Sequence, residues 1–226
     1  MRRYPKDRVM VYIDGFNLYY GSLRDQPYRW LNIEALSRAL LTNRQELIAV
    51  KYFTAKVKDT PAKPGQRVRQ EKYLRALGTL PKVEIFYGHF QARTAIRLLE
   101  NPPKNRRKGD IGLRSVWIQE EKGSDVNLAT HLIADHLRAR YELALVISND
   151  GDLKMPVELV REKDNPVGVI NPHPNRRRSY ALSPRNIQPP SFYRCLRPRL
   201  LRNSQLPKRL KDSERVIRCP KGWTEP

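Results

Sequence analysis

Residues 9–17 read Val-Met-Val-Tyr-Ile-Asp-Gly-Phe-Asn, an apolar run that leads directly into an aspartate, a glycine and an asparagine. Such a run is typical of a buried strand, and the glycine after it favours a turn into a helix. A second run, Leu143–Ile147, is followed in the same way by Ser-Asn-Asp-Gly-Asp at residues 148–152. Because the carboxyl ends of parallel strands share one edge of a sheet, the two stretches predict carboxylates that are close in space.

The composition indicates a globular protein that attracts polyanions. Its 226 residues fit one domain with extensions, or at most two small domains, and 39% of them are hydrophobic. Lys and Arg number 44 against 23 Asp and Glu, so the net charge is +21. Such an excess predicts nucleic acid as the first partner and an anionic membrane surface as the second. Solubility alone requires a smaller net charge in a small domain.

The cysteines and the N-terminus favour a reducing compartment. Cys195 and Cys219 are too few for a disulfide framework, and no Cys/His spacing indicates a zinc site. The first apolar run is too short for a signal peptide or a membrane span. We therefore expect a cytoplasmic protein with no membrane partner. The sequence leaves the oligomeric state open, and a homodimer is one assembly that it allows.

Strands and helices are expected to alternate along the chain. Strands are predicted at residues 9–13, 47–55, 83–87, 143–147 and 167–171, with a short one at 116–120, and helices at 16–23, 32–41, 66–77, 124–140 and 156–163. No regular pattern is evident from residue 88 to 112. The alternation predicts an α/β fold, a doubly wound parallel sheet of about five strands between helices. We expect this domain to span residues 1–175, and residues 176–226 to form a basic extension packed on it or trailing from it.

Four aspartates are the candidate catalytic and metal-binding residues. Asp14, Asp150 and Asp152 follow predicted strands, and Asp125 begins a predicted helix, where the helix dipole favours a negative charge. Asn17 lies one helical turn after Asp14, so its amide could orient that carboxylate or a substrate phosphate. Clustered carboxylates are costly without a cation, and Mg²⁺ or Mn²⁺ prefers such oxygen ligands. The structural alternative is an ordinary Asp-Gly turn and a helix cap.

Three stretches together resemble the motifs of the NYN family, which belongs to the PIN-like nuclease superfamily. They are Val11–Leu18, Glu121–Ala129 and Ile147–Leu153, and their order and strand context match over roughly residues 8–171. The resemblance implies a parallel sheet between helices and a Mg²⁺- or Mn²⁺-dependent ribonuclease. It also implies roles for single residues: metal binding by Asp14, Asp125, Asp150 and, as a fourth acid, Asp152, a polar helper in Asn17, and a further contact from Ser148.

One position departs from the family pattern. The helix of the second motif often carries another aspartate where this chain has His131. The missing carboxylate could weaken a second metal site or alter the acid–base chemistry. The histidine itself could bind metal or phosphate, or it could lie on the helix surface.

Ten basic residues are candidate contacts to RNA phosphates. They lie on the helix at 66–77, in a basic loop at 101–109, beside the second motif and in the extension: Arg67, Arg69, Lys72, Lys104, Arg106, Arg107, Lys122, Arg176, Arg177 and Arg178. Any one of them is also consistent with a solvated surface, but without cations the acidic cluster would repel a polyanionic substrate. The aromatic residues Tyr180, Phe192, Tyr193 and Trp223 could stack on bases or pack on the core.

The leading hypothesis is a metal-dependent ribonuclease that hydrolyses RNA phosphodiester bonds through the acidic Mg²⁺ or Mn²⁺ cluster. The alternative is a non-catalytic RNA- or protein-binding module on the same fold. A haloacid-dehalogenase-like phosphatase would need Asp-x-Asp after the first strand, where this chain has Asp-Gly-Phe. A dinucleotide enzyme would need Gly-x-Gly-x-x-Gly after a strand, and the chain has no such sequence.

Overall fold

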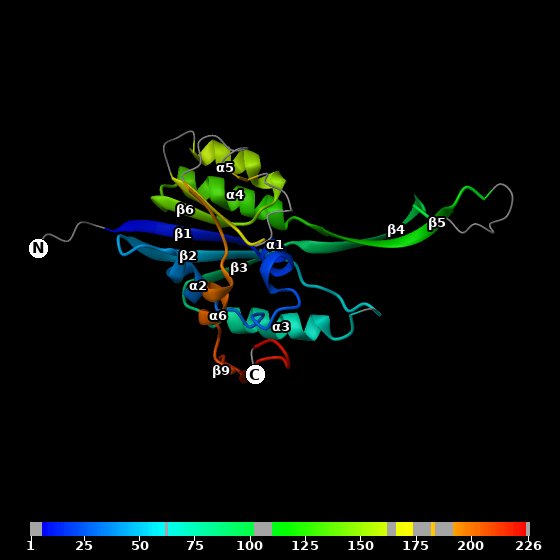
Figure 1. Cartoon of the computed structure of the whole chain (residues 1–226), viewed down its shortest axis with the longest axis horizontal. Helices are drawn as coiled ribbons and strands as arrows, with labels where there is room; N and C mark the ends of the chain where they lie inside the picture. Colours follow the sequence, from blue (N-terminus) through cyan, green and yellow to red (C-terminus); the bar gives the residue numbers. More distant parts are fainter. Residues whose placement is uncertain are drawn as a thin grey trace, which may run out of the picture.

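The computed structural model describes residues 6–61, 63–101, 110–161, 166–173, 182–183 and 192–224, without the side chain of Gln119. A six-stranded sheet in the order β3-β2-β1-β6-β7-β8 lies at its centre (Figure 1). Every neighbouring pair in this sheet is parallel. The predicted α/β fold with a doubly wound parallel sheet is therefore confirmed, with a sixth strand beyond the five expected.

The elements follow the predicted alternation closely. The sheet contains β1 (Asp7–Asp14), β2 (Gln45–Thr54), β3 (Val83–Tyr87), β6 (Leu143–Ile147), β7 (Val167–Asn171) and β8 (Phe192–Cys195). The helices are α1 (Gly15–Leu18), α2 (Ile33–Leu40), α3 (Gln66–Leu77), α4 (Ser124–Leu137), α5 (Lys154–Arg161) and α6 (Pro198–Asn203). The chain also forms two short helical segments, the π-helix η1 (Tyr19–Leu23) and the 3₁₀ helix η2 (Gly151–Leu153).

Helices cover both faces of the sheet because β1 is apolar on both sides. Val9, Val11 and Ile13 belong to the core shared with α2 and α3, whereas Met10 and Tyr12 belong to the core shared with α4 and α5. In Figure 1, α4 and α5 lie on one side of the sheet and α2, α3 and α6 on the other. A strand buried on both faces reads as an unbroken apolar run, as residues 9–13 do.

The strand order places a crevice at the carboxyl ends of β1 and β6. The chain runs outward from β1 to β2 and β3, and then returns to pair β6 with the other side of β1. Loops after neighbouring strands diverge at such a reversal, and this is where open α/β sheets bind ligands. The two strands that were predicted to end in acid are the two neighbours at this point.

A long hairpin replaces the irregular segment expected after residue 88. The strands β4 (His89–Leu98) and β5 (Leu113–Lys122) pair antiparallel and project from the sheet as an arm (Figure 1). Apolar side chains on it are exposed, including Ile96 at 70% and Trp117 at 59%. Because the arm does not pack on the core, its sequence lacks the alternation of buried and exposed residues by which strands are recognised.

The C-terminal part of the chain packs against the domain. β8 pairs with β7 at the edge of the sheet, and a small hairpin forms from β9 (Arg209–Lys211) and β10 (Val216–Arg218). The ring of Trp223 contacts Trp30 and Tyr73, with centroids 6.4 and 6.0 Å away. The predicted RNA contacts Lys104, Arg106, Arg107, Arg176, Arg177 and Arg178, and the aromatic residue Tyr180, lie outside the described residues.

Among the described residues, no helix combines the length and the apolar character that crossing a membrane requires.

Candidate metal centre

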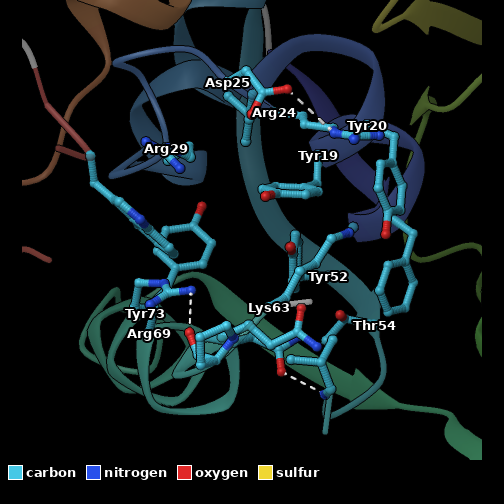
Figure 2. Close-up of a pocket in the computed structure, with 18 residues that line it drawn as sticks. Tyr19, Tyr20, Arg24, Asp25, Arg29, Tyr52, Thr54, Lys63, Arg69 and Tyr73 are labelled. Carbon is cyan, nitrogen blue, oxygen red and sulfur yellow. Dashed lines mark hydrogen bonds and ion pairs between the residues drawn. The ribbon is translucent and has the colours of Figure 1, made fainter. Parts of the chain in front are cut away.

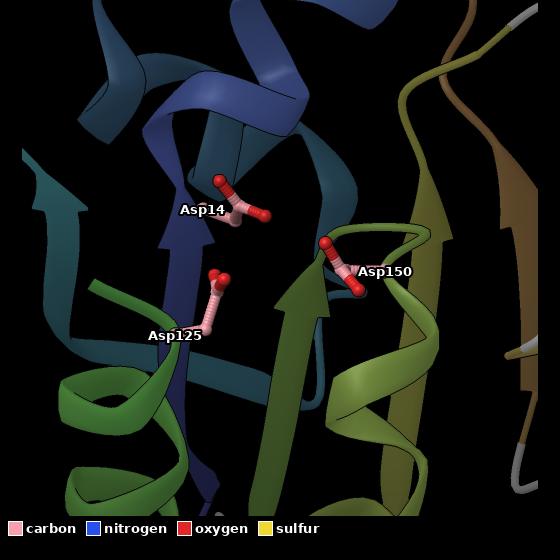
Figure 3. A group of neighbouring side chains, drawn as sticks. All are labelled: Asp14, Asp125 and Asp150. Atoms are coloured by element: carbon pink, nitrogen blue, oxygen red, sulfur yellow. The ribbon is translucent and has the colours of Figure 1, made fainter. Parts of the chain in front are cut away.

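Three carboxylates meet at the crevice. Asp14 is the last residue of β1, Asp125 lies in the first turn of α4, and Asp150 follows β6. Each offers one carboxylate oxygen, and these atoms all lie within 4.8 Å of one another. Figure 3 shows the three side chains converging from separate elements. The pairing of β1 with β6 brings together residues that are more than 130 positions apart in the sequence.

Two hydrogen bonds hold the carboxylate of Asp14. The backbone N–H of Asn17 donates to its Oδ1 at 2.9 Å, and the hydroxyl of Ser148 donates to its Oδ2 at 3.0 Å. The same hydroxyl oxygen accepts from the backbone N–H of Asp150 at 3.1 Å. Asp14 and Asp150 are therefore positioned relative to each other through Ser148.

The side chain of Asn17 joins the two loops directly. Its Oδ1 accepts a hydrogen bond from the backbone N–H of Asn149 at 3.0 Å. Asn17 thus contacts Asp14 through its backbone and the loop after β6 through its amide. This geometry is what a residue that orients the carboxylates requires.

A glycine at position 15 allows the close packing beneath the site. A Cβ built on Gly15 would lie 2.7 Å from the Tyr52 ring and 2.8 Å from the carbonyl oxygen of Phe53. Any larger residue would displace either β2 or the start of α1. The Asp-Gly pair at 14–15 therefore has a packing reason in addition to its role as a turn.

Burial and mutual repulsion raise the pKa values of two of the acids. Asp14 is buried, and its pKa is raised to about 7, chiefly by loss of hydration and further by the charge of Asp125. The pKa of Asp125 is raised to about 6 by burial and by the charges of Asp150 and Glu121. Among the described residues, no ion pair involves Asp14, Asp125 or Asp150. Three clustered carboxylates without a cationic side chain fit a hard divalent cation such as Mg²⁺ or Mn²⁺.

The crevice around the acids measures about 410 Å³ and includes residues that the sequence did not single out. Besides the three acids, its walls are formed by Phe16, Asn17, Tyr20, Phe90, Glu121, Ser124 and His173. Glu121 is the first residue of the second motif, so its position could have indicated it. Phe90 and His173 carry no such signal, because the arm and the end of β7 reach the crevice only through the fold.

One expected contributor, Asp152, and the residue whose role was left open, His131, lie outside the acidic group. Asp152 is exposed and outside the group of three, although its backbone N–H donates to Asp150 Oδ1 at 3.0 Å. His131 lies six residues after Asp125 and packs against the ring of Phe86, with its Nδ1 3.1 Å from Lys51 Nζ. Burial and the charge of Lys51 lower the pKa of this histidine. Its ring is half-buried beside the sheet, so it is neither in the acidic group nor a fully exposed surface residue.

The predicted RNA contacts that the structure describes are spread over two elements. Arg67 and Lys72 are exposed on α3, and Arg67 pairs with Glu71 at 2.9 Å. Arg69, on the same helix, lines a second cavity. Lys122 ends β5 and pairs with Glu120 at 3.3 Å. None of these four forms a wall of the acidic crevice.

Comparison with known proteins identifies the family. The profile of the NYN domain matches residues 8–183, which contain the sheet up to β7 and all three acids. The chain belongs to the NYN domain family. Its fold is accordingly PIN-like and of the nuclease type, as the motifs predicted.

Two individual proteins are also similar to this NYN chain. The 6-hydroxy-3-succinoylpyridine 3-monooxygenase HspA of Pseudomonas putida is 33% identical over an alignment of 194 residues, which covers 76% of this chain and 62% of the relative. The chain thus spans less than two thirds of that relative's length. A crystal structure of a protein of unknown function from Vibrio parahaemolyticus superposes with a TM-score of 0.52 at 16% identity, covering 88% of this chain and 98% of that one. The second likeness concerns the fold alone.

Proposed function

We propose that this NYN protein is a metal-dependent ribonuclease that hydrolyses phosphodiester bonds of RNA. The observation that carries the proposal is the convergence of Asp14, Asp125 and Asp150 on one point of the crevice. Such a cluster is costly in a folded protein unless a divalent cation compensates it. Its position at the reversal of strand order is where this fold class places its ligands.

The three carboxylates would hold Mg²⁺ or Mn²⁺, and Asn17 and Ser148 would keep them in place. When bound, such an ion supplies a Lewis acid that favours ionisation of water and neutralises charge on the phosphodiester. Asp14 is held by two donors, so little reorganisation of this carboxylate is needed during the reaction. The crevice is open to solvent, so a substrate phosphate could reach the three acids.

The charge of the whole chain supports an RNA substrate. The excess of 21 positive charges attracts a polyanion, whereas the acids alone would repel one. Basic residues on α3 and at the base of the arm lie outside the crevice, where they would contact the phosphates that flank the cleaved bond.

Substituting asparagine for either of two proposed metal ligands, Asp14 and Asp150, tests the assignment. Asp14→Asn and Asp150→Asn keep the side-chain shape but remove a negative oxygen ligand, so we expect Mn²⁺-dependent cleavage of a labelled RNA to fall about 100-fold or more. RNA binding, measured by fluorescence anisotropy in EDTA, is expected to persist or to strengthen. Asp7→Asn is the matched control, because Asp7 is exposed and begins the same strand that Asp14 ends.

Cleavage at the wild-type rate in both variants would overturn the metal-centre assignment. RNA binding without cleavage by the wild-type protein, across single-stranded and structured substrates and both metals, would favour the non-catalytic binding module instead.

A second candidate function is hydroxylation of a small aromatic compound. It is motivated by the 33% identity to HspA, whose name describes a monooxygenase acting on 6-hydroxy-3-succinoylpyridine. Such a reaction needs O₂ and a reductant, and one oxygen atom enters the ring while the other leaves as water. Oxygen uptake that depends on both NADH and 6-hydroxy-3-succinoylpyridine would support this candidate. Uptake indistinguishable from the buffer control, together with metal-dependent RNA cleavage, would exclude it.

A further inference from the structure

A second cavity lies beside the acidic crevice. It measures about 400 Å³, within the range of roughly 300–1,000 Å³ typical of ligand pockets. Phe16 and Tyr20 form walls of both the cavity and the crevice, so the two are adjacent. A ligand that extends from one into the other would have one part beside the carboxylates and the next part in the cavity.

The walls of this cavity are aromatic. They include Tyr19, Tyr20, Tyr52, Tyr73 and Trp223 in addition to Phe16 (Figure 2). The Tyr73 hydroxyl donates to the carbonyl oxygen of Leu31 at 2.9 Å, which fixes its ring. The rings of Tyr19 and Tyr20 pack edge to face, with their centroids 5.2 Å apart. Fixed rings of this kind provide faces on which a flat heterocycle can stack.

Cationic side chains surround the same cavity. Arg24, Arg29, Lys63 and Arg69 line it, and Asp25 is the only acid among the described residues that line it. Arg69 is anchored through a hydrogen bond to the carbonyl oxygen of Pro64 at 3.0 Å. Aromatic faces combined with several cations favour a flat ligand that carries a negative charge.

Arg29 in particular is incompletely paired. One of its terminal nitrogens donates to the carbonyl oxygen of Gly222 at 2.6 Å, and its guanidinium lies 5.6 Å from the centre of the Trp223 ring. Its Nε is buried without a hydrogen-bond partner among the described residues. A buried donor without a partner is costly, and an anionic acceptor nearby would relieve this cost.

We infer that the cavity binds one unpaired nucleobase and its phosphate, next to the position where RNA would be cleaved. The inference rests on the proposed function and names a subsite for it. The base stacks on the tyrosines, and the phosphate contacts the cations of the rim. Trp223 lies beyond the family match at 8–183, so the C-terminal part of this chain supplies one wall of the subsite.

RNA fits the surroundings better than a small aromatic acid does. Bases and phosphates alternate along a strand, and the cavity and the crevice offer places for a base and for a reacting phosphate side by side. A double helix keeps its bases stacked and paired, so only an unpaired nucleotide can enter the cavity.

Calorimetric titration with adenosine 5′-monophosphate in EDTA tests the subsite without any need for cleavage. We expect saturable binding, with adenosine and inorganic phosphate each binding more weakly. Tyr20→Ala removes a stacking face and should weaken the binding of the nucleotide about 10- to 100-fold. Arg69→Gln should weaken the binding of the nucleotide but leave the binding of adenosine unchanged, because the substitution removes a contact to the phosphate.

Two exposed residues outside both cavities serve as controls. Tyr87 is exposed to 46%, as Tyr20 is, and Arg44 lies at the opposite end of the sheet. Tyr87→Ala and Arg44→Gln should leave nucleotide affinity unchanged. An equal loss in these controls would overturn the assignment, and so would unchanged affinity in both Tyr20→Ala and Arg69→Gln.

The test separates the subsite from the nuclease proposal. Nucleotide binding in EDTA with no RNA cleavage in Mn²⁺ would retain the cavity as a nucleotide site and refute the nuclease. RNA cleavage without saturable nucleotide binding up to millimolar concentrations would refute the subsite alone. Binding of 6-hydroxynicotinate with no binding of the nucleotide would also refute the nucleotide subsite and would favour a small aromatic acid as the ligand of the cavity.

Discussion

Asp14 carries a negative charge that its surroundings disfavour. Its carboxylate is buried, receives two hydrogen bonds and faces two other acids. The hydrogen bonds favour the ionised form, but loss of hydration outweighs them, so the pKa rises to about 7. Protonation of Asp14 is therefore favoured relative to a free aspartate in the absence of metal.

This shift of the pKa predicts a dependence of stability on pH. Because the pKa values of Asp14 and Asp125 are raised to about 7 and about 6, their contribution favours the folded state at low pH and is lost as pH rises through these values. In EDTA we expect the melting temperature of the wild type, relative to Asp14→Asn, to fall between pH 5 and pH 8. The change amounts to a few kcal/mol at most, at about 1.4 kcal/mol per pKa unit.

Mn²⁺ should reverse this effect at pH 8, because it binds the ionised carboxylates of the folded state. The control Asp7→Asn should behave like the wild type throughout. The prediction would be contradicted if the melting temperatures of the wild type and of Asp14→Asn changed in parallel from pH 5 to pH 8 and did not respond to Mn²⁺.

At the scale of elements, the arm formed by β4 and β5 is separable from the sheet. Its strands pair with each other, and most of its side chains are exposed. Only its base reaches the crevice, where the ring of Phe90 packs edge to face against the ring of Phe16, with the centroids 5.8 Å apart. The arm is therefore expected to add little to the stability of the sheet.

Shortening the arm tests this independence. Joining Gln91 to Glu120, which face each other in the hairpin, through an Asn-Gly turn retains Phe90 and Glu121 at the crevice. We expect the melting temperature to change by no more than about 2–4 °C, the shift that about 1 kcal/mol causes in a domain of roughly 150–250 residues. Metal-dependent cleavage of a short oligonucleotide should persist. An unfolded product, or loss of cleavage by a folded one, would show that the arm is part of the domain core or of the site.

For the whole molecule, charge is the dominant property. Many of the basic residues behind the net charge of +21 belong to α3, the arm and the C-terminal quarter of the sequence. The three candidate metal-binding acids, in contrast, lie in a single crevice. Long-range attraction of a polyanion would therefore come from the surface as a whole, and the proposed chemistry would be confined to the crevice. Such a separation lets a polyanion approach an acidic centre.

This distribution predicts that RNA affinity depends strongly on salt. If the protein neutralises six or more phosphates, its affinity for a single-stranded 20-nucleotide RNA should fall by roughly 300-fold or more between 50 and 200 mM salt. Anisotropy titrations in KCl measure this slope. Binding of adenosine 5′-monophosphate, which carries one phosphate, should change far less. An RNA affinity insensitive to salt would show that the positive surface does not contact the backbone.

Much of the fold could be predicted because the signals are local. The strands 83–87, 143–147 and 167–171 and the helix 66–77 form with the predicted bounds. Strands 143–147 and 167–171 are buried along their whole length, strand 83–87 is rich in β-branched and aromatic residues, and the helix carries apolar residues at helical spacing. The convergence of Asp14, Asp125 and Asp150 follows from the same logic, because each stands at the end or the start of such an element. Asp152 was expected with them, yet it lies outside the group because η2 turns its side chain to solvent.

The amino-acid sequence thus determined the α/β class, the edge of the sheet that carries the acids, and the charge that implies a polyanionic partner. Tertiary contacts alone brought β8 into the sheet, Phe90 to the crevice and Trp223 to the wall of the second cavity. They also paired Lys51 with Asp135 in the core at 2.6 Å, an arrangement that neither residue's neighbours in the sequence indicate. The reason is physical: periodicity records which side of an element is buried, but not which distant residue lies against it.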